Sequence, residues 1–302
     1  MTTSHQDLFP SRLERKAPMF ERLDPVVHGN EEQQAQGPLS PEEVAEFERK
    51  GFLSFPAYFD QAEMEAFLAE LRDYERDEDL KLSEGVILEP GHEEIRSIFG
   101  IHRISERFDR LTRDPRLLRI VEQLLGSGAY IHQSRINYKP GFKGKGFNWH
   151  SDFETWHTED GMPRMRCISC SVALTENNEF NGPLMLVPGS HRYFVPTVGR
   201  TPEDNYKSSL KNQEIGVPDE ASLQQLVHEG GIEAPKGPAG SLTIFECNTL
   251  HASNANMSPF PRSNLFFVYN SVQNAVREPY CGNKPRPGFL AERYDFRALE
   301  PV

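Results

Sequence analysis

The 302-residue sequence lacks the features of membrane and secreted proteins. It has no apolar stretch approaching the ~20 residues that a membrane helix needs. Its first residues, MTTSHQDLFPSRLERK, contain no apolar core of a signal peptide. Four cysteines are too few to indicate a disulfide framework in a chain of this length. These absences predict a cytoplasmic protein with no membrane partner.

Two of the few cysteines, Cys167 and Cys170, form a CxxC motif. No second cysteine pair follows to complete a zinc site. The surrounding run RCISCSVALT is typical of a strand, so we predict that both thiols are buried and structural. A redox or zinc role is the less favoured alternative.

Basic residues are in the minority. The sequence has 33 Lys and Arg residues against 45 Asp and Glu residues, which gives a formal net charge of −12. An acidic protein is repelled by polyanions and by anionic membrane surfaces. The charge therefore predicts that nucleic acids are not partners of this chain.

The chain is long enough for one elaborate domain with a sizeable core. Residues 1–39 are polar and interrupted by Pro and Gly, and we interpret them as an arm lying on the surface or on a partner subunit. Residues 40–302 are predicted to form a single domain. Capping signals predict helices in its first part. They span residues 40–51, opened by Ser40 and Glu43; 60–77, opened by Asp60 and Glu63; and 114–126, opened by Asp114 and ended by Gly126.

Strand patterns dominate from Tyr130 onward, so the fold class is mainly β with flanking N-terminal helices. The predicted strands are 130–139, 164–175, 182–190, 240–246 and 264–273, separated by Gly, Pro and Asn clusters. Short strands with turn signals predict a sandwich or barrel of the jelly-roll type over about residues 130–275. The polar stretch 197–236 is interpreted as an excursion from this barrel.

One predicted strand has two unlike faces. Over residues 167–174, bulky apolar side chains alternate with Cys, Ser and Ala. The small face either leaves room for a ligand inside the barrel or permits close packing of a second sheet. The sequence leaves both interpretations open.

His150 and Asp152, in the run GFNWHSDFETWH, are the leading candidates for a metal site. On a strand, residues i and i+2 point to the same side, so both side chains can reach one ion. The other His-x-Asp/Glu triplets, which begin at positions 5, 92 and 157, lie in polar or charged surroundings. Only the triplet at position 150 has a suitable downstream partner.

That partner is His251, which follows another predicted strand. Two histidines and one carboxylate form the ligand set of non-haem Fe(II) oxygenases, which leave coordination positions open for a cosubstrate and O2. Arg262 lies 11 residues further on, and its guanidinium can bind a carboxylate bidentately. The combination predicts an oxygenase with a dicarboxylate cosubstrate.

These residues, together with the run LMLVPGSH at 184–191, resemble the phytanoyl-CoA dioxygenase-like branch of the Fe(II)/2-oxoglutarate oxygenases. The run from Gln133 to His191 is similar to the signature of ectoine hydroxylases, and the segments DLFPSR and RPGFLAERYDF also fit that family. The resemblance implies a double-stranded β-helix (jelly-roll, cupin-like) core and a homodimer. It also implies conversion of L-ectoine to 5-hydroxyectoine, with 2-oxoglutarate converted to succinate and CO2.

The residues near the metal motif suit such a substrate, a cyclic amidine that bears a carboxylate. Trp156 can offer an aromatic face to the amidinium. Gln133 can hydrogen-bond the ring and Arg135 can meet a carboxylate, on the same strand face as Asn137. Polar residues facing inward are costly unless they bind something polar, although a solvent-exposed strand face is the alternative.

Further site residues follow from the resemblance alone. It places Lys139 and Asn137 near the cosubstrate, beside Arg262, and Phe266 in the wall of the pocket. Two competing functions remain. One is an oxygenase of the same class that hydroxylates another small amine or amino acid. The other is a non-catalytic module that binds a metal or a small ligand.

Overall fold

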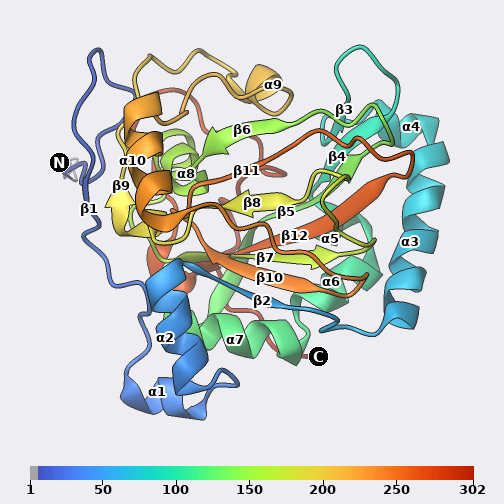
Figure 1. Ribbon diagram of the computed structural model, residues 1–302, viewed down its shortest axis with the longest axis horizontal. Coiled ribbons are helices and arrows are strands. Elements are labelled where there is room, and N and C mark those ends of the chain that lie inside the picture. Colours follow the sequence, from blue (N-terminus) through green and yellow to red (C-terminus); the bar gives the residue numbers. More distant parts are fainter. Residues whose placement is uncertain (1–5) are drawn as a thin grey trace.

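The computed structural model describes residues 6–302, and its core is built from two facing antiparallel sheets (Figure 1). The larger sheet has the spatial order β2 (Phe52–Phe55), β10 (Leu242–Glu246), β7 (Cys167–Ala173), β12 (Arg262–Ser271), β5 (Ala129–Lys139), β4 (Ile95–Phe99) and β3 (Val86–Leu88). The smaller has the order β6 (Phe147–His150), β11 (His251–Ser253) and β8 (Leu184–Leu186). The predicted jelly-roll core, mainly β with flanking helices, is confirmed.

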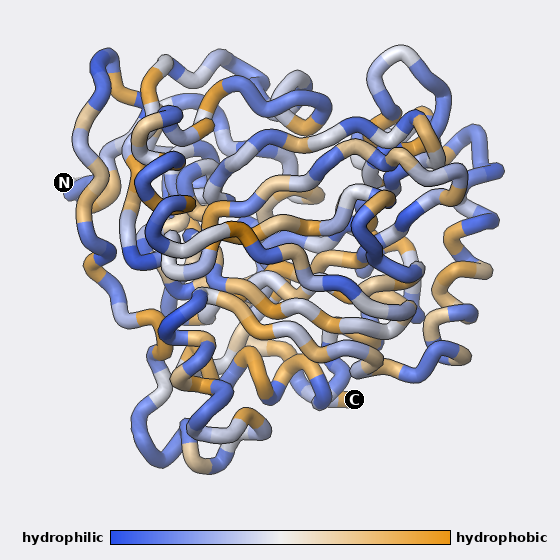
Figure 2. The backbone as a smooth tube through the Cα atoms, in the orientation of Figure 1, coloured by the Kyte–Doolittle hydropathy of each residue, from blue (hydrophilic) through white to orange (hydrophobic). Residues whose placement is uncertain are grey.

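Side chains meet between the sheets and also behind the larger one. Phe52, Leu186, Phe245 and Phe266 form an apolar cluster shared by the two sheets. On the opposite face of the larger sheet, Ile136 and Phe267 belong to the main apolar core. Figure 2 shows hydrophobic segments concentrated in these central strands and in helix α7 (Pro115–Leu125). Alternate residues of β5 and β12 are therefore left to face the space between the sheets.

Helices are packed around the two sheets on several sides (Figure 1). They are α1 (Glu31–Gln36), α2 (Pro41–Lys50), α3 (Gln61–Arg76), α4 (Glu78–Lys81), α5 (Ile101–Ile104), α6 (Glu106–Thr112), α7 (Pro115–Leu125), α8 (Asp152–Asp160), α9 (Tyr206–Ser209) and α10 (Glu220–Gly230). Short 3₁₀ turns lie at Ser190–Arg192 and Val272–Asn274. No helix in residues 6–302 is long and apolar enough to cross a membrane.

The predicted helix starts are confirmed, with one correction. Ser40 and the side chain of Glu43 form the expected capping box, and Gly51 ends α2 with φ 84°. Asp60 caps α3 through the amide of Ala62, but Glu63 does not close a capping box. Its carboxylate pairs with Arg116 of α7 instead, at 2.6 Å. The ion pair between the two helices therefore takes the place of the expected hydrogen bond from the Asp60 backbone amide to Glu63.

The two-faced strand, β7, does not face the cavity that holds the predicted site residues. Its bulky residues Ile168, Cys170 and Val172 belong to the main core. Among residues 6–302, none of its small residues lines the cavity between the sheets. Close packing of the sheet therefore accounts for the small residues of β7. Cys167 and Cys170 are buried free thiols in separate apolar clusters, so the predicted structural role is confirmed.

The N-terminal segment is more deeply embedded than its polar composition indicates. Phe9 is fully buried, and the Arg12 side chain is buried beside α8. Strand β1 (Phe20–Glu21) pairs with β9 (Tyr193–Phe194) in a small separate sheet.

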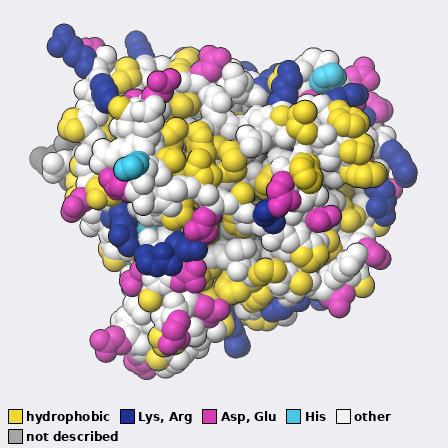
Figure 3. Space-filling model, in the orientation of Figure 1, with side chains coloured by type: hydrophobic (Ala, Val, Ile, Leu, Met, Phe, Trp, Pro, Cys, Tyr) yellow, Lys and Arg dark blue, Asp and Glu magenta, His cyan; other side chains and the backbone are white. Residues whose placement is uncertain are grey.

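Acidic and basic side chains are interspersed on the face of the molecule that Figure 3 draws.

Candidate active site

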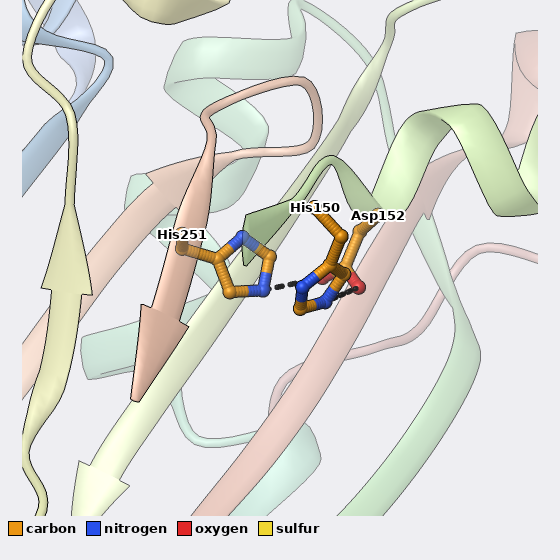
Figure 4. Close-up of side chains that lie close together, drawn as sticks. All are labelled: His150, Asp152 and His251. Carbon is orange, nitrogen blue, oxygen red and sulfur yellow. Dashed lines mark ion pairs between the residues drawn. The ribbon is translucent and has the colours of Figure 1, made fainter. Parts of the chain in front are cut away.

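His150, Asp152 and His251 come together where β6 ends and β11 begins in the smaller sheet (Figure 4). His150 and His251 are directly paired across β6 and β11, so their rings lie side by side with centroids 4.1 Å apart. Nε2 of His150 lies 3.6 Å from Oδ1 of Asp152, and Nε2 of His251 lies 3.7 Å from Oδ2 of Asp152. One atom from each residue fits within 4.8 Å of the others.

The position of Asp152 differs from the prediction. We expected His150 and Asp152 on one strand, but β6 ends at His150 and Asp152 is the first residue of α8. Ser151 is the N-cap between them, in extended backbone geometry. The turn between β6 and α8 therefore brings the two side chains together. The alternation of side chains along one strand, on which the prediction relied, is not the cause.

Both histidine rings are oriented by backbone carbonyls. Nδ1 of His150 lies 2.8 Å from the carbonyl oxygen of Asn148, and Nδ1 of His251 lies 3.0 Å from that of Thr249. A carbonyl can only accept, so Nδ1 carries the proton and Nε2 carries the lone pair. Both lone pairs therefore point toward Asp152, as a metal site requires.

The charge states also suit a divalent cation. Burial and the neighbouring His150 lower the pKa of His251 to about 4, so its ring is neutral. Burial raises the pKa of Asp152, but the imidazoles and Arg135 outweigh that effect and hold it well below its ordinary value. Oδ2 of this buried carboxylate has no hydrogen-bond partner among residues 6–302. An unpaired buried carboxylate oxygen between two imidazole nitrogens fits Fe(II).

The triad opens into a cavity between the two sheets. It is lined by every predicted site residue: Gln133, Arg135, Asn137, Lys139, His150, Asp152, Trp156, His251, Arg262 and Phe266. Gln133, Arg135 and Asn137 share one face of β5, as predicted, and that face forms part of the cavity wall. Trp149 is absent from this lining and joins an apolar cluster outside it, as its position beside His150 suggests.

Arg262 and Lys139 form the basic end of this cavity, directly paired across β12 and β5. Arg262 is 3% exposed, and its Nη2 donates to the carbonyl oxygen of Gly182. Its Nε has no partner within the described part of the chain. Burial and the charge of Arg96 lower the pKa of Arg262 to about 10, which leaves it protonated at neutral pH. A buried guanidinium with a free donor is suited to an incoming carboxylate.

Lys139 is held more tightly than its neighbour. Its ammonium group lies 2.6 Å from the carbonyl oxygen of Lys145 and 2.7 Å from that of Asn254. Burial, followed by the charges of Arg262 and Arg96, lowers the pKa of Lys139 to about 6. A bound dianion would offset those two charges and favour the protonated lysine.

Gln133, Arg135 and Phe266 form a connected wall at the other end of the cavity. The Gln133 amide donates to the carbonyl oxygen of Leu290 at 2.7 Å and accepts from Arg135. The Arg135 guanidinium lies over the Phe266 ring, 4.7 Å from its centroid. An amide has two donors and two acceptor sites, so Gln133 can still bond a ligand.

Trp156 lies on α8, on the same helix as Asp152. It lines the cavity and is only 2% exposed. The edge of its ring meets His132, with centroids 5.4 Å apart. His132 and His191 lie outside the cavity lining.

A family comparison accords with this geometry. The sequence profile of the phytanoyl-CoA dioxygenase (PhyH) family matches residues 47–264. The chain belongs to this family. It is 53% identical to an ectoine dioxygenase of Bordetella bronchiseptica, over 100% of this chain and 97% of that protein. It is 54% identical to an ectoine dioxygenase of Halomonas elongata, over 96% of this chain and 87% of that protein.

Solved structures of the family have the same fold. The crystal structure of EctD from S. alaskensis with 2-oxoglutarate and 5-hydroxyectoine matches with a TM-score of 0.88 and 45% identity, over 98% of each chain. The structure of EctD from S. alaskensis with bound Fe matches with a TM-score of 0.87, again over 98% of each chain. The chain is thus a phytanoyl-CoA dioxygenase family member of the ectoine dioxygenase branch.

Several cavity residues escaped prediction from the sequence. Arg96 comes from β4, a strand we did not expect, and pairs with Glu89 at 2.9 Å. Arg286 comes from the C-terminal segment and pairs with Asp160 at 2.6 Å. The excursion over 197–236 also lines the cavity, through Asn205, Ser209, Leu210, Gln213 and Ile215. Arg286 opens the run RPGFLAERYDF, which fits the family but gave no reason to place this arginine in the cavity. Arg96 lies outside any motif, and the polar character of the excursion was the single signal for the residues it contributes.

Proposed function

We infer that this member of the family is an Fe(II)- and 2-oxoglutarate-dependent oxygenase that hydroxylates L-ectoine to 5-hydroxyectoine. The observation that carries the proposal is the content of one cavity. It combines a two-histidine, one-carboxylate triad with a buried arginine that has a free donor. Relatives about half identical along their whole length are named ectoine dioxygenases.

The proposed roles at the metal end follow from the donor set. His150, Asp152 and His251 would hold Fe(II) through two Nε2 atoms and a carboxylate oxygen. When bound, Fe(II) with 2-oxoglutarate and O2 supplies the chemistry that converts a C–H bond to C–OH, while 2-oxoglutarate becomes succinate and CO2. Arg262 would bind the distal carboxylate of 2-oxoglutarate, with Lys139 and Asn137 beside it. The buried cavity walls keep this chemistry away from bulk water.

The proposed substrate contacts lie at the other end of the cavity from Arg262 and Lys139. Trp156 would offer an aromatic face to the delocalised amidinium of ectoine. Gln133 would hydrogen-bond the ring, and Arg135 would meet the substrate carboxylate, stacked on Phe266. These roles rest on the lining of the cavity and on chemical complementarity.

A substrate panel tests the choice of substrate. Purified protein with Fe(II), 2-oxoglutarate and O2 would be offered L-ectoine or one of several other small amines and amino acids, with succinate measured for each. L-Ectoine is expected to stimulate succinate formation far above the level without substrate. Equal or greater stimulation by another amine would move the assignment to a different oxygenase of the same class.

We also propose a cytoplasmic homodimer that makes a compatible solute under osmotic stress, with residues 40–302 as one catalytic domain and residues 1–39 as an arm. The family resemblance supports these features. Sedimentation equilibrium tests the dimer. A mass of twice 34.5 kDa is expected, and a monomer at micromolar concentration would contradict it.

A further inference from the structure

Asn248 is a buried amide in the short turn between β10 and β11, three residues before His251. It is 2% exposed and does not line the cavity. Its side chain nevertheless makes three hydrogen bonds to distant parts of the chain. Desolvated amides are costly unless satisfied, so these bonds hold the turn in one place.

One of these bonds reaches the other half of the metal-binding triad. The hydroxyl of Ser151 donates to Oδ1 of Asn248 at 2.9 Å. Ser151 lies between His150 and Asp152 and does not line the cavity, and its hydroxyl also accepts from the backbone amide of Glu154 at the start of α8. Next to the Ser151–Asn248 bond, the amide of Phe153 donates to the carbonyl oxygen of Cys247 at 2.9 Å. The turn before His251 is thereby attached to the residues on both sides of Asp152.

The other bonds of Asn248 fix it to the scaffold. Its Nδ2 donates to the carbonyl oxygens of His191 and Tyr193, at 3.2 and 2.8 Å. Its backbone amide donates to the carboxylate of Glu246 at 2.7 Å, and that carboxylate also accepts from Arg22 at 3.2 Å. The oxygen atoms that accept these hydrogen bonds belong to buried or partly buried residues, so the turn that carries Asn248 has little freedom to shift.

We propose that Asn248 is a positioning residue for the metal site, acting through Ser151 to hold Asp152 and His251 at a fixed separation. The two ligands come from segments that are 99 positions apart in the sequence. β6–β11 pairing, the backbone hydrogen bond from Phe153 to Cys247 and this Asn248–Ser151 link join those segments directly beside the triad, and the Asn248–Ser151 link is the one made by two side chains. The inference rests on the proposed function, because it assumes that the triad binds Fe(II).

The test measures Fe(II) affinity under anaerobic conditions, by competition with a fluorescent chelator, without turnover. The variants are Asn248→Ala, Ser151→Ala and Ser151→Thr, which restores the hydroxyl. Gln123→Ala is the matched control, because Gln123 is 3% exposed and its amide also makes three hydrogen bonds, to Leu39 and Gln34. It lies on α7, on the far side of the larger sheet.

Loss of groups that orient metal ligands typically weakens affinity about 10- to 100-fold. We expect about tenfold weaker Fe(II) binding in Asn248→Ala and Ser151→Ala, with unchanged binding in Gln123→Ala and recovery in Ser151→Thr. Wild-type affinity in folded Ser151→Ala would overturn the inference, as would equal weakening in Gln123→Ala. If Asn248→Ala fails to fold, Asn248→Ser takes its place, because Ser151→Ala also removes the N-cap hydrogen bond of α8. Absence of Fe(II) binding by the wild-type protein would instead refute the proposed function.

Discussion

Arg262 shows how a single side chain can define one end of the cavity. It is buried and charged, yet its Nε is unsatisfied within residues 6–302. A charge-assisted hydrogen bond contributes about 1.5–3 kcal/mol. We therefore expect Arg262→Ala to raise the KM for 2-oxoglutarate by roughly 10- to 100-fold, with a smaller effect on kcat.

Steady-state kinetics at varied 2-oxoglutarate concentration would check this prediction. Arg262→Lys should recover only part of the loss, because lysine keeps the charge but not the planar fork. Arg297→Ala removes an exposed arginine and should leave KM unchanged. A larger rise in the KM for ectoine than for 2-oxoglutarate would contradict the assigned role of Arg262.

Trp156 is the side chain through which substrate binding can be observed directly. The sequence has two tryptophans, Trp149 and Trp156. Trp149→Phe leaves Trp156 as the sole source of tryptophan fluorescence. We expect ectoine, added with 2-oxoglutarate and a redox-inert divalent metal, to change that emission.

The kinetic counterpart uses Trp156→Ala, which should raise the KM for ectoine more than the KM for 2-oxoglutarate. Because the side chain also belongs to an apolar cluster, its removal should lower stability by about 3–5 kcal/mol. Trp156→Phe therefore serves as a milder variant. Equal changes in both KM values would count against a substrate contact.

Residues that share a motif could be predicted from the sequence, and isolated residues could not. The alternation of Gln133, Arg135 and Asn137 on one strand was enough to place them on one face. Arg286 lies far along the chain from its partner Asp160, and only tertiary packing brings them together. No local pattern carries that information.

Helix α8 is the element that the sequence predicted least well. All but one of its residues are buried, including several that carry charge, so it has no polar face to give an amphipathic pattern. Arg12 from the N-terminal segment neutralises two of those charges. Its Nη2 lies 3.0 Å from Glu154, and its Nη1 pairs with Glu159.

We expect Arg12→Ala to destabilise the protein by about 3–5 kcal/mol, because it leaves buried carboxylates without a counter-charge. Urea unfolding of the metal-free protein measures the loss. Arg297→Ala, which breaks an exposed ion pair, should cost less than about 1 kcal/mol. Similar losses in the two variants would mean that the Arg12 network adds little to stability.

The end of α2 contains a pH-sensitive contact. His191 is fully buried beneath Gly51, and its Nε2 lies 3.1 Å from the carbonyl oxygen of Glu48. Burial and the charge of Arg22 lower the pKa of His191 to about 3. In the unfolded chain the ordinary value is about 6.5. As the pH falls below that value, the unfolded state takes up the proton first, so stability is lost.

The buried His191 therefore leaves the free energy of unfolding unaffected above about pH 7 and lowers it by about 2 kcal/mol at pH 5. His191→Gln should show a smaller fall in unfolding free energy between pH 7.5 and pH 5. His228→Gln, at an exposed position, is the control. An unchanged pH dependence in His191→Gln would show that this ring does not govern acid stability.

At the scale of the whole molecule, the strand pattern was sufficient for the fold class. Short strands separated by turn residues predicted the jelly roll, and most strand positions agreed with the structure. Strands β3 and β4 were missed, because they belong to a region where helix signals dominate. The role of segment 197–236 also required the structure, since its polar residues gain meaning only where they cover the cavity.

Coupled turnover tests the central claim most directly. Purified protein would be supplied with Fe(II), 2-oxoglutarate, O2 and L-ectoine, and 5-hydroxyectoine and succinate would be measured together. We predict equal amounts of both products, with neither formed without iron or in the Asp152→Ala variant. Succinate without 5-hydroxyectoine would remove ectoine as the substrate, and full activity of Asp152→Ala would contradict the metal site itself.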